Sequence, residues 1–247
     1  MALTTIGLMA LLGCFTGFMA GLLGIGGGMI ITPFLIMLIP SSLIPHEHIV
    51  HVAIATSLAT IAFTSLSSVR AHHKRGAVLW NVVASVAPGI LVGAVVGAQI
   101  AGWLPTFWLS LIFAAFVGFS AFKMFLNKSP RPDRNLPGTI GKFFMGIAIG
   151  ILSALVGAGG GFISVPWMIW CNVKMQNAVA TSAAFGFPIA LFGTIGYIIS
   201  GWNVSGLPPW PIDLGYICIP ALFSVAITSV LFAPLGAKVC LLYTSPS

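Results

Sequence analysis

Two copies of one short glycine run lie inside long apolar stretches of this sequence. The first copy is residues 24–28 (GIGGG), followed by Pro33, and the second is residues 157–161 (GAGGG), followed at the same distance by Pro166. The two copies are 133 residues apart. Glycine interrupts helices, and an interrupted helix inside a bilayer is tolerated only where it lines a cavity or is buried in protein. The glycine runs are therefore the first candidates for a binding site.

The composition excludes an ordinary soluble fold. Of the 247 residues, 58% are hydrophobic and 5% are charged, with a mean hydropathy of +1.09, whereas soluble domains carry about 25% charged residues. The chain is therefore predicted to be a polytopic membrane protein with roughly eight segments of about 20 residues each. Its four cysteines are scattered without CxxC spacing, which favours buried packing over a metal site or a disulfide framework.

The first glycine run divides an apolar stretch that extends from Thr4 to Ile39. Its second arm has about 11 residues and would be about 16 Å long as a helix, which is too short to cross a hydrocarbon core of about 30 Å. We therefore expect a re-entrant helical hairpin with the glycines at depth. Three transmembrane helices are predicted to follow it, over residues 49–69, 79–101 and 107–126.

The second half repeats this order after a hydrophilic linker. The predicted units are a first repeat over residues 1–126, a cytoplasmic basic linker over 127–142 and a second repeat over 143–247. Beyond the glycines, the sequence AIATS at 53–57 matches AVATS at 178–182. The second repeat is expected to contain a hairpin at 143–170 and helices at 178–199 and 212–239. Nothing after Val239 corresponds to residues 107–126, so the second repeat is expected to be truncated, without its last helix.

The positive charges predict the orientation of the repeats. If the basic cluster from Arg70 to Arg75 is cytoplasmic and each hairpin returns to its own side, all ten Lys and Arg residues lie on or near the cytoplasmic side. Each repeat then crosses the membrane an odd number of times, so the two repeats are inverted. The alternative, in which each hairpin region crosses once, gives parallel repeats and places Lys174 and Lys238 outside. Charge therefore favours an all-α membrane protein of two inverted repeats.

Helices that start after Gly28 and Gly161 would direct unpaired N–H groups, and the positive ends of their dipoles, toward the glycine breaks. Two such ends favour an anion, and glycine permits the positive φ angles that a nest of N–H groups requires. The alternative is that the glycines serve only close helix packing. The candidate ligands from the breaks are Gly26, Gly27, Gly28, Gly159, Gly160 and Gly161.

Polar side chains near the breaks are further candidates. The duplicated hydroxyls could donate to anion oxygens, or alternatively could form interhelical and i−4 backbone hydrogen bonds; they are Thr56, Ser57, Thr181 and Ser182. Gln176 and Asn177 are candidate amide donors, with a helix-start role as the alternative. His51 could take up a proton, and it lies in a loop region with His46, Glu47 and His48 where solvation is favoured over a zinc site.

The acidic residues narrow the function further. Glu47 and Asp133 lie in predicted loops and Asp213 begins a predicted helix, so no carboxylate is expected at membrane depth. This argues against a cation channel or a carboxylate-based ion relay. The sequence also has no catalytic pattern that would indicate an intramembrane enzyme.

These motifs together resemble the TauE/SafE sulfite exporter family. The resemblance rests on residues 17–28 (GFMAGLLGIGGG) with Pro33, on residues 150–161 (GILSALVGAGGG) with Pro166, and on the ATS triplets at 55–57 and 180–182. It implies a multi-pass protein of a prokaryotic inner membrane that transports small sulfur-containing anions such as sulfite, sulfoacetate or related organosulfonates. The family is broad, so the resemblance does not identify the substrate.

The expected mechanism is alternating access with the anion held at the paired glycine breaks. The expected partners are this small inorganic or organic anion and the lipid bilayer, with no cofactor, metal or nucleic acid. An anion channel and a cation-coupled transporter of another small organic anion remain as alternatives, and the sequence leaves the oligomeric state open.

Overall fold

The computed structural model describes residues 3–24, 26–39, 44–125, 135–202, 204 and 214–243. Within these ranges the chain is helical apart from turns and one isolated β-bridge between Leu214 and Ile217. The helices are α1 (Leu3–Leu23), α2 (Gly28–Leu38), α3 (Ile49–His73), α4 (Trp80–Trp103), α5 (Thr106–Phe125), α6 (Thr139–Val156), α7 (Gly161–Trp170), α8 (Met175–Gly201) and α9 (Ile219–Tyr243). The all-α prediction is thus confirmed for the described part of the chain.

Six of these helices are long and apolar enough to cross a membrane: α1, α3, α4, α6, α8 and α9. The helices α2 and α7 are apolar but have only 11 and 10 residues, so each is too short to span a bilayer of about 30 Å. The short helices directly follow the glycine runs, as predicted. The protein is a multi-pass membrane protein.

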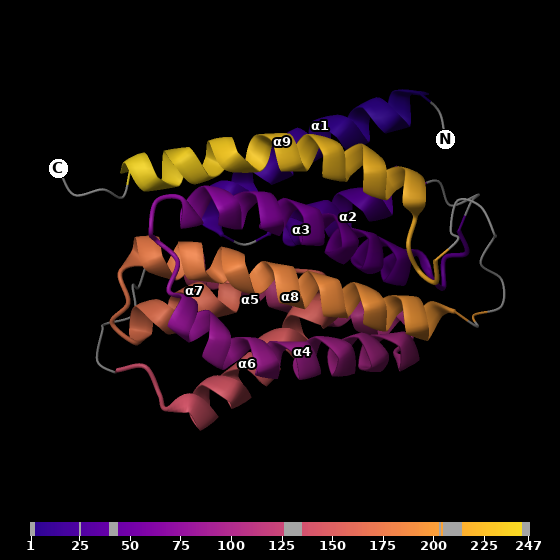
Figure 1. Ribbon diagram of the computed structural model, residues 1–247. Coiled ribbons are helices and arrows are strands. Elements are labelled where there is room, and N and C mark those ends of the chain that lie inside the picture. Colours follow the sequence, from indigo (N-terminus) through magenta and orange to yellow (C-terminus); the bar gives the residue numbers. More distant parts are fainter. Residues whose placement is uncertain are drawn as a thin grey trace.

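The helices form two sets that run in opposite directions (Figure 1). The helices α1 and α9 are parallel, because Gly13 contacts Val225 and, eight residues later in both helices, Gly21 contacts Ala233. Contacts between α3 and α8 run oppositely, because Leu58 lies beside Gly193 whereas Ser65 lies beside Gly186. The set α1, α3 and α9 is therefore antiparallel to the set α4, α6 and α8.

Backbone contacts through glycine join the helices within each set. A Cβ built on Gly17 of α1 would lie 2.6 Å from the Cα of Ser229 in α9, and one on Gly93 of α4 would lie 2.9 Å from the Cα of Ile147 in α6. No side chain fits at either position without a shift. Small residues allow this approach, which is the usual basis of helix association in membranes.

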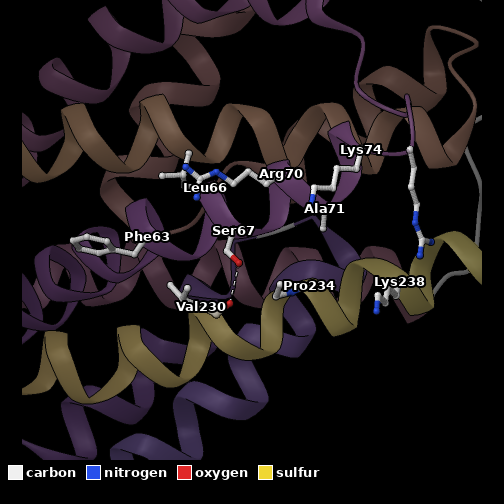
Figure 2. Close-up of a pocket in the computed structure, with 10 residues that line it drawn as sticks. Phe63, Leu66, Ser67, Arg70, Ala71, Lys74, Val230, Pro234 and Lys238 are labelled. Carbon is white, nitrogen blue, oxygen red and sulfur yellow. Dashed lines mark hydrogen bonds between the residues drawn. The ribbon is translucent and has the colours of Figure 1, made fainter.

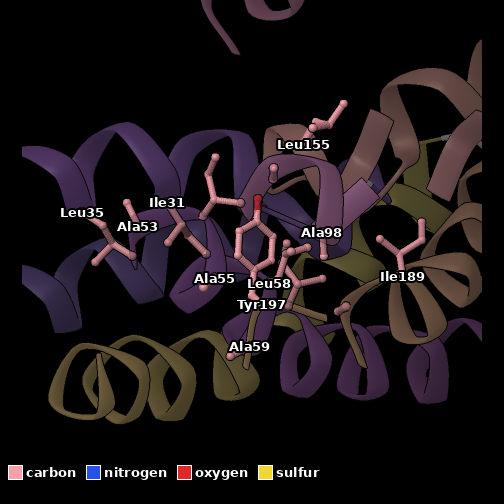
Figure 3. Packing of buried hydrophobic residues seen from close by; sticks show 14 of the residues in the cluster. Ile31, Leu35, Ala53, Ala55, Leu58, Ala59, Ala98, Leu155, Ile189 and Tyr197 are labelled. Carbon is pink, nitrogen blue, oxygen red and sulfur yellow. The ribbon is translucent and has the colours of Figure 1, made fainter. Parts of the chain in front are cut away.

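The helix α3 is the most enclosed of the six long helices. In its apolar window 78% of residues are buried, against 33–56% in the other five. The core around its contact with α8 contains Leu58, Ala55 and Tyr197 (Figure 3). The Tyr197 hydroxyl donates to the Ala154 carbonyl oxygen at 3.1 Å, which satisfies its polar group inside this core.

The basic residues belong to helix ends that lie at one end of the molecule, where α1, α3, α5 and α9 finish and α4, α6 and α8 begin (Figure 1). Every Lys and Arg of the described residues belongs to these helix ends: Arg70, Lys74, Arg75, Lys123, Lys142, Lys174 and Lys238. Lys128, Arg131, Asp133 and Arg134 of the predicted linker lie outside the described residues. Glu47 lies at the opposite end, before α3.

Two helix boundaries differ from those expected. The helix α3 continues to His73, through part of the basic cluster. The helix α9 begins at Ile219 rather than at residue 212, because the chain first turns through the Leu214–Ile217 bridge with Gly215 at φ +59°. Pro220 then occupies the first turn of α9, where its missing N–H costs nothing. Asp213 and residues 244–247 lie outside the described part.

Candidate functional site

The two glycine runs end one helix and start the next with the same backbone geometry. Gly27, before α2, has φ 76° and ψ −10°, and Gly160, before α7, has φ 77° and ψ −10°. Gly24, Gly26 and Gly157 also have positive φ. Residues with a Cβ pay a steric cost in this left-handed region, so the breaks require glycine at these positions.

The breaks are in direct backbone contact with each other. A Cβ built on Gly26 would lie 2.9 Å from the Cα of Gly159, and one on Gly28 would collide with the carbonyl oxygen of Gly157. The candidate glycines from both halves of the sequence are thus brought together, between α3 and α8.

Both short helices start at this contact. The first intrahelical bonds are from the N–H of Ile30 to the Gly27 oxygen at 3.1 Å and from the N–H of Ile163 to the Gly160 oxygen at 3.2 Å. The N–H groups at positions 28–29 and 161–162 precede these bonds, as at any helix start. Two helix N-termini therefore converge, and their dipoles favour negative charge there.

The serines of the two ATS triplets bond across the two halves of the chain. Ser57 donates to the carbonyl oxygens of Gly28 at 3.3 Å and Gly157 at 3.2 Å. Ser182 donates to the Gly24 oxygen at 3.0 Å and accepts a bond from Ser164 at 2.8 Å. Ser57 thus shares its one hydroxyl proton between the glycine runs of both halves, whereas Ser182 donates its proton to the glycine run of the other half.

The threonines of the triplets hold the starts of two long helices. The Thr56 hydroxyl accepts the N–H of Cys218 at 3.0 Å, directly before α9. The Thr181 hydroxyl accepts the N–H of Leu79 at 3.1 Å, directly before α4. Both side chains have 0% exposure, as do Ser57 and Ser182. The interhelical bonding that the sequence left as an alternative is therefore present in this arrangement, where it satisfies helix-start N–H groups.

The two triplets are not brought next to each other. Leu58, which follows Ser57, lies beside Gly193 of α8, and Ser182 precedes Gly193 by 11 residues, or about 16 Å of helix. The glycine breaks occupy the space between them. A ligand that contacts both triplets would therefore have to displace the backbone of the glycine breaks or extend along it.

The amide candidates lie at one side of this region. Gln176 and Asn177 are half-buried in the first turn of α8. Val179, two residues after Asn177, has its carbonyl oxygen 2.5 Å from the position of a Cβ on Gly24. The amides therefore lie on the side of Gly24, where the first glycine run starts. Gly26 and Gly28, which contact the second run, come later in the first run.

Two hydroxyls beside the breaks were missed by the sequence reasoning. Thr32 Oγ1 and Ser153 Oγ are buried without a hydrogen-bond partner. They lie 3.0 and 3.3 Å from the positions of a Cβ on Gly157 and Gly160, respectively. An unpaired buried hydroxyl is costly and requires an explanation. Only duplicated hydroxyls were predicted from the sequence, and neither Thr32 nor Ser153 has a hydroxyl at its repeat position. In the sequence, only the closeness of Thr32 to the first glycine run indicates a role at the breaks.

His51 lies away from the breaks, at the end opposite to the basic residues. Its Nε2 atom is 3.0 Å from the Ala101 oxygen and 3.1 Å from the Leu104 oxygen, and the Tyr216 ring stacks on it at 5.2 Å. These contacts join α3 to the turn between α4 and α5. Proton uptake by His51 stays a prediction. Among the described residues, no three His, Cys, Asp or Glu side chains are grouped to hold a metal ion.

Comparison with known proteins gives one family. The family model described as sulfite exporter TauE/SafE matches residues 9–245. A "Probable membrane transporter protein" of Haemophilus influenzae is 34% identical over 95% of this chain and 89% of its own length. Bacillus subtilis YdhB, with the same description, is 30% identical over 75% of this chain and 76% of its own. Methanocaldococcus jannaschii MJ0441, likewise so described, is 28% identical over 94% and 85%. No solved structure matches the chain.

Proposed function

The chain belongs to the sulfite exporter TauE/SafE family of membrane transporters, and we propose that it exports small sulfur-containing anions across a prokaryotic inner membrane. Sulfite, sulfoacetate and related organosulfonates are the proposed substrates. The observation that carries the proposal is the direct contact between the two glycine breaks, from each of which a short helix starts. Two helix N-termini meeting inside a membrane protein favour an anion over a cation.

The anion is held between the breaks by backbone N–H groups and by hydroxyls. Thr32 and Ser153 have hydroxyl protons without an acceptor, so they supply the first side-chain contacts. In the described part of the chain the one carboxylate, Glu47, lies at the end of the molecule opposite the basic residues, so no fixed negative charge opposes the anion. An inside-negative potential favours its exit by about 2.3 kcal/mol per charge per 100 mV.

Transport requires the closed contact to open. The antiparallel helix sets, and the opposite directions of corresponding helices such as α3 and α8, support two inverted repeats that rock against each other around the site. In this mechanism Ser57 and Ser182 release the glycine carbonyls on opening and become free to donate to the anion, and the basic end faces the cytoplasm. Thr56, Thr181, Gln176 and Asn177 line the paths toward the breaks.

A counterflow assay in liposomes tests the substrate class. Purified protein is reconstituted into liposomes, and these are loaded with unlabelled anion. The uptake of labelled sulfite, sulfoacetate, sulfate and chloride is then compared. We expect exchange of sulfite or sulfoacetate, and a loss of most of it in Thr32→Val and Ser153→Ala. Ser120→Ala is the control, because the Ser120 hydroxyl bonds within α5 to Phe116. Absence of exchange for every anion would contradict the proposal.

The same liposomes separate the alternatives. An anion channel would give unitary currents and no counterflow. A cation-coupled transporter would show uptake that depends on a sodium or proton gradient. If the coupling ion is the proton, His51→Gln would remove the dependence on the pH gradient and leave anion exchange at equal pH intact.

A further inference from the structure

A groove runs between α3 and α9 on the outside of the helix set that contains them. At the basic end of the molecule it forms a cavity of about 450 Å³. Figure 2 shows Arg70 of α3, Lys74 directly after α3 and Lys238 of α9 around it, with Phe63 and Leu66 farther along α3. Arg75 lines it as well. All four cationic side chains are exposed, and they reach the groove from both of its walls.

The groove continues away from the cations as an apolar channel. A second cavity, of about 350 Å³, shares Phe63 and Val230 with the first and is lined otherwise by apolar side chains of α9, from Leu222 to Leu231. From Leu222 to Pro234 the apolar wall has a length of about 18 Å at helical rise. This length is close to the hydrocarbon thickness of one leaflet, about half of 30 Å.

Charge and polarity together identify the occupant. We propose that this groove binds one anionic phospholipid, with its phosphate headgroup among the four cations and an acyl chain along the apolar wall. Basic pockets between transmembrane helices are suited to such headgroups. Phe63, Phe223 and Leu231 are 53%, 58% and 65% exposed, so the channel is open to the bilayer from the side. A soluble anion would use the cations but leave the apolar channel empty.

The corresponding seam of the other helix set is closed at the equivalent position. Between α4 and α8, Gln99 stands where α9 has Lys238, and its amide donates to the Gly196 oxygen at 3.1 Å. A Cβ built on Gly196 would lie 2.6 Å from the Ala98 Cβ, so these helices are in close contact. The seam between α3 and α9 is held instead by the Ser67 hydroxyl, which donates to the Val230 oxygen at 2.9 Å. The groove is therefore a local feature and not a consequence of the repeated architecture.

The groove is separate from the glycine breaks. On α3, Ile61 packs against Gly26 and Gly28, whereas Phe63, Leu66 and Arg70 line the groove. In the described residues no carboxylate lies at this end of the molecule to neutralise the cations. The lipid site can thus be tested without reference to the transported anion.

Lipid binding is measured on the purified full chain by native mass spectrometry and by the melting temperature in detergent with added phosphatidylglycerol or phosphatidylcholine. We expect phosphatidylglycerol to remain bound and to raise the melting temperature more than phosphatidylcholine does. Arg70→Gln with Lys74→Gln should lose most of both effects, and Lys238→Gln should lose part of them. The matched control is Lys142→Gln with Lys174→Gln, which removes the same charge at the same end but outside the groove.

A third variant separates the lipid from a soluble anion. Ile227→Trp, at an exposed residue that lines the apolar channel, fills this channel without changing the charge of the groove. It should reduce phosphatidylglycerol retention while the melting temperature without lipid is kept. The proposal is overturned if both lipids bind equally, if the control loses as much binding as Arg70→Gln with Lys74→Gln, or if inorganic phosphate displaces the lipid at equal concentration. The last outcome would identify a site for soluble anions.

Discussion

At the scale of single residues, the duplicated hydroxyls stabilise helix starts. Thr56 and Thr181 each accept a backbone N–H from the residue before a long helix of the other half, at Cys218 and Leu79. These N–H groups have no intrahelical acceptor because they precede the helix. The threonines therefore have a structural role in this arrangement of the helices.

Replacing Thr56 tests this role. Thr56→Val keeps the shape of the side chain but leaves the Cys218 N–H without its acceptor, which should cost about 1–3 kcal/mol of stability. Thr56→Ser keeps the hydroxyl and should be close to the wild type. Thermal unfolding in detergent measures both variants. Equal melting temperatures for all three proteins would show that the N–H finds another partner, such as water.

At the scale of helices, glycines on one face decide which helices associate. Gly13, Gly17 and Gly21 of α1 all lie against the backbone of α9, and the seam between α4 and α6 is built in the same way. In a bilayer the lipid is as apolar as the side chains, so close backbone approach, rather than the burial of an apolar face, drives this association.

Two alanine substitutions within α1 separate packing from helix propensity. Gly17→Ala would place a Cβ against the Ser229 backbone and should destabilise the protein by about 1–3 kcal/mol. Gly7→Ala, where nothing lies within 4 Å, should be neutral or stabilising by up to about 1 kcal/mol because alanine is the better helix former. Chemical denaturation of both variants gives the comparison. A similar loss in both would show that the α1–α9 seam is not close-packed.

At the scale of the whole molecule, the two antiparallel helix sets contact each other through α3 and α8, and the glycine breaks lie at this interface. Rocking of one set against the other would open the breaks to one side at a time. A fixed pore would leave the contact between α3 and α8 unchanged during transport.

A disulfide between the two sets distinguishes these mechanisms. A Cβ built on Gly186 would lie 3.2 Å from the Ser65 Cβ, close to the separation of about 3.5–4.5 Å in disulfides. Ser65→Cys with Gly186→Cys should lose counterflow on oxidation and regain it on reduction, whereas each single variant should not respond. Full transport by the oxidised protein would argue against rocking at this contact.

The positions of the membrane helices, of their breaks and of the basic residues could be predicted from the sequence, because hydropathy, glycine conformation and charge act locally along the chain. The sequence also indicated that Gly26 and Gly159 belong to matching motifs. Three features could not be predicted and are seen only in the fold. Thr56 bonds to Cys218, the Thr32 and Ser153 hydroxyls are unpaired, and cations at α3 and α9 share one groove. These facts depend on which helices adjoin, and helices that are apolar on every face carry no periodic pattern that specifies their neighbours.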